Sequence, residues 1–152
     1  MIAAHEALER LREGNRRFAA NESAHDAGNE ARRRELVGGQ NPFAVILGGS
    51  DSRVPAENVF DQGIGDLFVI RVAGNVVAPS LVGSVEFACS AFGTRLVVVM
   101  GHTQCGAVQA TLDALQKPGE LASENIGAIA EFIRPAVEAV LASGREAAAD
   151  VI

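Results

Sequence analysis

Tryptophan and tyrosine are absent from this sequence, and seven phenylalanines are its only aromatic side chains. An aromatic platform for stacking bases or sugars is therefore not expected. The two cysteines, Cys89 and Cys105, cannot form a disulfide framework and suit the reducing cytoplasm, where we expect the protein to reside. No apolar run approaches the roughly 18 residues of a membrane span, and the first residues lack the apolar stretch of a secretion signal. We therefore expect no membrane association.

Positive charge is also scarce, because 13 lysines and arginines face 19 aspartates and glutamates and leave a net charge of −6. Nucleic acids and anionic membranes select basic surfaces, so neither is expected as a partner. What the chain has is ordinary globular composition, with 48% hydrophobic residues over 152 positions. That length predicts one domain, residues 1–152, with a sizeable core.

Three short apolar segments predict buried strands, at residues 43–48, 67–73 and 95–101. Because nearly every position in them is apolar, we expect strands that are covered on both faces. Helical patterns precede, separate and follow them, at residues 2–21, 30–37, 55–61, 80–92, 104–115 and 125–141. Strands alternating with helices predict an α/β fold with a mainly parallel sheet flanked by helices. In such sheets ligands bind outside the carboxyl ends of the strands.

The third strand is followed by "GHTQCGA", which places His102 and Cys105 three residues apart where a helix begins. Imidazole and thiolate are preferred zinc ligands, and a turn of this kind can bring both to one ion. Taken alone, such a pair is more often a buried structural cysteine beside a capping histidine. A second strand end that carries an acid favours the metal site.

That second strand end is "GGSDSRVP", in which Asp51 and Arg53 stand two residues apart on a loop. A carboxylate held by a guanidinium keeps a low pKa and can accept a hydrogen bond from a water at a metal. Released from the arginine, the carboxylate can bind the metal itself. The alternative is an Asx-turn in which Asp51 caps the helix at Pro55 and Arg53 makes an exposed ion pair of little value.

Three stretches together resemble the β-class carbonic anhydrases: "SDSRVPAENVFDQGIGDLFVIRVAGNVV", "GSVEFA" and "VVVMGHTQCGAV". The likeness runs from "LREGNRRF" in the first helix to at least Val108, about two-thirds of the chain. The resemblance implies a parallel-sheet enzyme that binds one Zn²⁺ per subunit and interconverts CO₂ and bicarbonate. It also implies a homo-oligomer, a dimer or a multiple of dimers, in which residues 1–38 form a helical dimerisation arm and pockets are lined from both subunits.

The resemblance assigns roles to single positions. His102 and Cys105 match zinc ligands, and Asp51 with Arg53 matches a catalytic dyad. Its aspartate orients the attacking water or, in an inactive arrangement, swings round to become a metal ligand. The implied substrate-binding residues are Gln40 as a donor to the substrate, Phe68, Ala73 and Phe87 on the apolar wall of the CO₂ pocket, and Gly106 after the last ligand.

Gly49 stands where the family has its first zinc-binding cysteine, so one ligand is lost. Three outcomes are open: Asp51 becomes the third ligand, zinc is lost, or the pocket turns over another small substrate such as a different heterocumulene. The competing function is a non-catalytic, metal-free scaffold or partner-binding protein. The family also continues with a helix and an edge strand beyond Ile152, so we expect that closing element to be missing.

Overall fold

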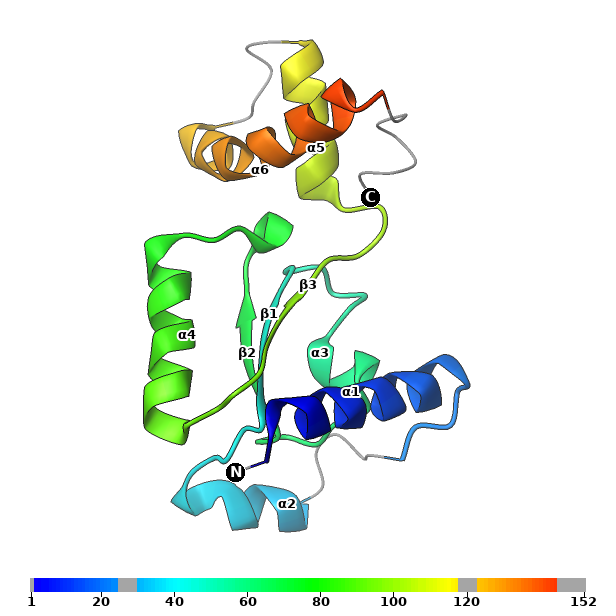
Figure 1. Cartoon of the computed structure of the whole chain (residues 1–152), viewed down its shortest axis with the longest axis vertical. Coiled ribbons are helices and arrows are strands. Elements are labelled where there is room, and N and C mark those ends of the chain that lie inside the picture. Colours follow the sequence, from blue (N-terminus) through cyan, green and yellow to red (C-terminus); the bar gives the residue numbers. More distant parts are fainter. Residues whose placement is uncertain (1, 25–29, 118–122, 145–152) are drawn as a thin grey trace.

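The computed structural model describes residues 2–24, 30–117 and 123–144. Its centre is a parallel sheet of three strands in the order β2-β1-β3 (Figure 1). The strands are β1 (Ala44–Gly48), β2 (Leu67–Arg71) and β3 (Val97–Met100). The helices and short 3₁₀ turns are α1 (Ala4–Ala19), α2 (Glu30–Glu35), η1 (Leu36–Gly38), α3 (Ala56–Val59), η2 (Ala73–Asn75), α4 (Pro79–Phe92), α5 (Gly106–Gln116) and α6 (Glu124–Ala142). The predicted α/β class is confirmed.

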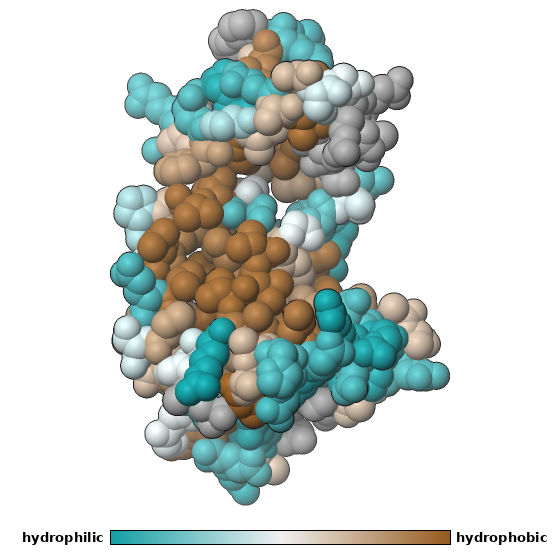
Figure 2. Space-filling view, viewed as in Figure 1, coloured by the Kyte–Doolittle hydropathy of each residue, from teal (hydrophilic) through white to brown (hydrophobic). Residues whose placement is uncertain are grey.

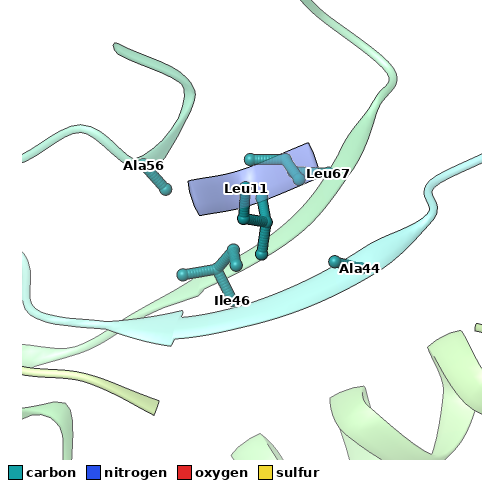
Figure 3. Packing of buried hydrophobic residues seen from close by; sticks show 5 residues of the cluster. All are labelled: Leu11, Ala44, Ile46, Ala56 and Leu67. Atoms are coloured by element: carbon teal, nitrogen blue, oxygen red, sulfur yellow. The ribbon is translucent and has the colours of Figure 1, made fainter. Parts of the chain in front are cut away.

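Helix α1 covers one face of the sheet. Leu11 on its inner side is 1% exposed and packs with Ile46 of β1 and Leu67 of β2 (Figure 3). The helix can approach closely because Gly14 has no side chain, and a Cβ there would overlap the carbonyl oxygen of Phe60. The first helix therefore lies on the sheet of its own chain, while the dimerisation role of residues 1–38 stays a prediction.

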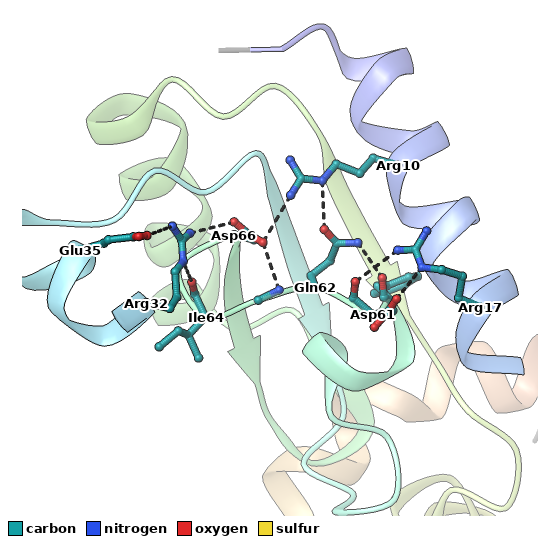
Figure 4. Close-up of polar contacts among 10 residues, drawn as sticks. Arg10, Arg17, Arg32, Glu35, Asp61, Gln62, Ile64 and Asp66 are labelled. Carbon is teal, nitrogen blue, oxygen red and sulfur yellow. Dashed lines mark hydrogen bonds and ion pairs between the residues drawn. The ribbon is translucent and has the colours of Figure 1, made fainter. Parts of the chain in front are cut away.

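Charged side chains hold α1 and α2 to the segment that precedes β2 (Figure 4). Arg17 forms an ion pair with the buried carboxylate of Asp61. The Asp66 carboxylate accepts hydrogen bonds from Arg10 and Arg32, and also from a backbone N–H. The three arginine contacts each join residues more than 30 positions apart, so they fix the amino-terminal helices to the segment before β2.

Helix α4 covers the other face, but only over β1 and β2, where Val45 and Ile70 are buried against it. On β3 the side chains of Val97 and Val99 are 42% and 60% exposed. The expectation that all three strands are covered on both faces is correct for β1 and wrong for β3, because no helix of the described residues lies over that part of the sheet. Figure 2 shows apolar side chains gathered over α4 and the neighbouring strands.

Helices α5 and α6 pack on each other and on η2, beyond the carboxyl ends of the strands (Figure 1). Gly74 in η2 has a φ of +69°, and a Cβ there would lie 2.5 Å from the Cδ1 atom of Ile133. Glycine is needed here because it tolerates the positive φ and because it leaves room for the Ile133 side chain. It brings the helix pair directly against the end of the sheet where ligands are expected.

Candidate active site

The ends of all three strands meet in one small pocket of about 140 Å³. Its lining residues are Gly49, Ser50, Asp51, Ala73, Gly74, His102, Cys105, Gly106 and Ala107. The sequence predicted this convergence from the parallel sheet, and the structure places Asp51, His102, Cys105, Ala73 and Gly106 around the same space. The pocket also includes Gly49, where the resemblance implies a lost ligand.

Asp51 and Arg53 form a bidentate ion pair. The Nε and Nη2 atoms of Arg53 donate to the two carboxylate oxygens over 2.9 and 2.7 Å. These hydrogen bonds hold the pKa of Asp51 well below its usual range, and they raise the pKa of Arg53. The backbone N–H of Arg53 also donates to Asp51, so the predicted Asx-turn is present together with the dyad. The predicted cap is not, because Asp51 makes no side-chain capping bond to α3.

His102 presents one ring nitrogen to the pocket. Its Nδ1 lies 2.9 Å from the carbonyl oxygen of Thr103. Since a carbonyl can only accept, Nδ1 carries a proton and Nε2 is free to offer its lone pair. Nε2 lies 3.9 Å from a carboxylate oxygen of Asp51. Gln104 precedes Cys105 in the chain and has a φ of +55°, which is rare for residues other than glycine. Strained backbone of this kind is most often found at functional sites.

Gly49 faces the free nitrogen of His102. A Cβ built at Gly49 would lie 3.3 Å from Nε2 and 3.4 Å from Cδ2. A donor side chain at this position would therefore reach the same point as the imidazole. Gly49 therefore leaves the inner wall of the pocket without a side chain, and its role as the site of a lost ligand stays a prediction.

The described residues offer zinc only part of a ligand set. Among them, no three histidine, cysteine, aspartate or glutamate side chains are placed to hold a metal ion together. His102 and Cys105 have the chemistry that zinc prefers and share the pocket. Both carboxylate oxygens of Asp51 instead accept hydrogen bonds from Arg53. As the side chains stand, two donors fit zinc and the third does not.

Arg71 supports the pocket from outside, and sequence reasoning missed it. At the end of β2, its guanidinium donates to the backbone carbonyls of Gly49 and Asp51, over 2.8 Å in the first case. These bonds fix the loop that carries the dyad. The only available signal was an arginine that ends an otherwise apolar strand.

Three of the implied substrate-binding residues lie elsewhere in this chain. Gln40 precedes β1 and lines a different pocket, of about 440 Å³, together with Arg10 and Phe43. Phe68 and Phe87 pack together at the α4 face, with ring centroids 6.2 Å apart. None of the three lines the pocket of Asp51 and His102. Their part in the site stays a prediction that needs a second copy of the chain.

Comparisons with known proteins identify the family and support this fold. The family profile described as carbonic anhydrase matches residues 44–151. Carbonic anhydrase of Mycolicibacterium smegmatis is 45% identical over 127 residues, and carbonic anhydrase 2 of Mycobacterium tuberculosis is 44% identical over the same length. Each match covers 84% of this chain and 61% of the relative. The chain thus spans less than two-thirds of these curated relatives.

Solved structures give the same result. The β-carbonic anhydrase of Coccomyxa, in complex with acetazolamide, superposes with a TM-score of 0.66 at 27% identity and covers 92% of this chain and 62% of its own. A β-carbonic anhydrase of Aspergillus fumigatus gives a TM-score of 0.63 at 28% identity, with 92% and 65% covered. The chain belongs to the β-carbonic anhydrase family. In the part of the chain that the structure describes, no helix is both long and apolar enough to cross a membrane.

Proposed function

We propose that this chain is a zinc-dependent carbonic anhydrase, which interconverts CO₂ and bicarbonate, and that Gly49 weakens its metal site. The observation that carries the proposal is the convergence of the Asp51–Arg53 dyad with His102 and Cys105 in one pocket. Family membership and the names of the relatives support the reaction. The two cysteines, too few for a disulfide framework, support a cytoplasmic location.

His102 and Cys105 would hold the Zn²⁺, one per subunit. When bound, the ion lowers the pKa of its water towards about 7 and so supplies hydroxide at neutral pH. The chain's own residues do the positioning. An ionised Asp51 accepts a hydrogen bond from the attacking water and turns its oxygen towards CO₂, and Arg53 keeps that carboxylate ionised and in place. Arg71 holds the loop beneath them.

Loss of the cysteine weakens zinc binding. Removal of one ligand of three costs roughly 10²-fold or more in affinity, at about 1.4 kcal/mol for each factor of ten. Asp51 can replace it only by giving up both hydrogen bonds from Arg53 and the task of orienting water. We therefore propose that two protein ligands hold the zinc, that the Asp51–Arg53 pair stays intact and that turnover is slow. This arrangement is favoured over one in which Asp51 is a permanent ligand.

The complete site is assembled from two copies of the chain. Gln40, Phe68 and Phe87 do not reach the pocket of their own subunit, so a partner subunit must supply them if they bind substrate. The exposed apolar side chains over α4 and β3 support a homodimer or a multiple of dimers. The net charge of −6 favours such partners over nucleic acid.

The test is Gly49→Cys, with Gly49→Ala as the matched control that adds a Cβ but no donor. We expect Gly49→Cys to bind one zinc per chain at least about 10²-fold more tightly than the parent, by competition with a chelator. It should also gain CO₂ hydration in stopped-flow assays, while Gly49→Ala gains neither. A folded, zinc-loaded Gly49→Cys protein without hydration activity would refute the enzymatic proposal and support a non-catalytic, partner-binding protein instead.

A further inference from the structure

A second pocket adjoins the candidate active site and has no role in the chemistry described so far. It occupies about 270 Å³ between α5 and α6. Ala110 and Thr111 of α5 line it on one side, and Ile126, Ile129 and Ala130 of α6 line it on the other. We call this space the α5–α6 chamber.

The chamber is apolar from its base to its mouth. Ala130, 3% exposed, and Thr111, 2% exposed, lie at the base, and Ile126, 41% exposed, lies at the mouth. The one hydroxyl group in the lining, that of Thr111, already donates to the carbonyl oxygen of Ala107 over 2.8 Å. Among the described residues, no charged side chain lines the space. An ion would lose its hydration there without gaining a partner, whereas an uncharged apolar molecule would lose nothing.

The chamber and the site share a wall of small residues. Ala73, Gly106 and Ala107 line both spaces. A Cβ built at Gly106 would meet no atom within 4 Å, so there is open space beside the wall at this residue. The helix pair that forms the chamber is also the one that Gly74 admits against the sheet. The chamber thus adjoins the pocket of His102 and Cys105, and Arg53 lines neither space.

We propose that the α5–α6 chamber is a binding site for a small, uncharged, linear apolar molecule, and that it holds CO₂ beside the site. The proposal rests on the proposed function for the identity of this ligand. Bicarbonate is charged and is excluded from the chamber. The chamber would therefore hold neutral CO₂, and the charged bicarbonate would be confined to the candidate active site.

The experiment uses nitrous oxide, which is isoelectronic with CO₂, has the same linear shape and does not hydrate. Zinc-free chain with ¹³C-labelled alanine and isoleucine methyl groups is titrated with dissolved nitrous oxide, and with nitrogen as the blank. We expect saturable shifts of the Ala110, Ile129 and Ala130 methyl signals. Bicarbonate at the same concentration should leave these signals unchanged. Shifts spread over the surface, or none at these methyls, overturn the proposal.

Two variants fill the chamber, and one control leaves it open. Ala110→Leu adds a side chain to its wall, and Ile126→Phe narrows its mouth, so each should abolish the nitrous oxide shifts at the remaining lining methyls. Ala128→Leu adds the same volume on the exposed side of α6 and should keep them. Ile126→Phe serves if Ala110→Leu does not fold. Unchanged shifts in a folded filled variant contradict the proposal.

The outcome is independent of the metal. Nitrous oxide binding is measured without zinc, so an inactive Gly49→Cys protein leaves the chamber untouched as a binding site. Conversely, hydration by Gly49→Cys with no nitrous oxide response would support the enzyme and refute the chamber.

Discussion

Both ends of the sheet place carboxylates beside arginines, but the two ion pairs differ in how deeply their side chains are buried. Near α1, the Asp61 side chain is 2% exposed and accepts from Arg17 and from the backbone N–H of Ala24. At the strand tips, Asp51 is 20% exposed and its partner Arg53 is 59% exposed. The first pair joins distant segments and fixes the fold. The second joins neighbours on one loop and leaves its surroundings open to a ligand.

Two glycines show the same contrast. Gly14 is required by packing, because a side chain there would collide with the backbone at Phe60. Gly49 has room for a side chain, and that side chain would face the free nitrogen of His102. The scaffold therefore needs its small residue at Gly14, whereas the pocket has room for a donor side chain at Gly49.

The largest effect is expected from Gly14→Ala. The added methyl overlaps the carbonyl oxygen of Phe60 at the end of α3, so α1 must move away from α3 and loosen the packing of Leu11. Overpacking of this kind costs about 1–3 kcal/mol or more. Urea denaturation followed by circular dichroism measures the loss.

Gly83→Ala is its matched control, because Gly83 lies inside α4 and a Cβ there meets nothing within 4 Å. Here alanine should stabilise the protein by roughly 0.5–1 kcal/mol. Equal effects of the two substitutions would show that α1 does not depend on its close contact with Phe60.

A smaller loss is expected from Arg17→Met. The substitution keeps much of the side chain's length but leaves the buried carboxylate of Asp61 without its guanidinium, at a cost of about 1–3 kcal/mol. Arg12→Met removes an exposed pair with Glu9 and should change the free energy of unfolding by less than about 0.5 kcal/mol. If Arg12→Met cost as much as Arg17→Met, burial would not be what separates the two regions.

Most of the fold could be predicted because the signals are local. Continuous apolar runs identified the strands, and β1 was expected one residue early, at Phe43. The prediction for β2 ran to residue 73, but the strand ends at Arg71 and residues 73–75 form a turn. The reason is long-range: Gly74 adopts its left-handed conformation where α5 and α6 pack. The exposure of Val97 and Val99 could not be predicted either. An apolar residue gives the same sequence pattern whether or not another part of its own chain covers it.

The site divides in the same way. Convergence of Asp51, His102 and Cys105 follows from parallel strands, whose carboxyl ends share one edge. The role of Arg71 in holding the loop of Asp51 could not be predicted, because its partners are backbone carbonyls, which every residue has. Gln40 was assigned by resemblance alone, and the five residues of β1, roughly 16 Å of strand, separate its end of the sheet from the pocket. A resemblance identifies which residues act but not which copy of the chain they act in.

The smallest effect on stability, and the sharpest on charge, is expected at Asp51. Because the Arg53 side chain lowers the pKa of this carboxyl, zinc-free protein should keep Asp51 ionised through about pH 4, where unfolded aspartates take up protons. The stabilisation is therefore complete above that pH and is lost only in stronger acid, as the pH falls through the folded pKa. Titration of the Asp51 carboxyl ¹³C signal measures it, and Arg53→Gln should move the midpoint up towards the ordinary value. An unshifted midpoint in Arg53→Gln would mean that the backbone, and not the guanidinium, holds the charge, and the dyad would then be free to release Asp51 to a metal.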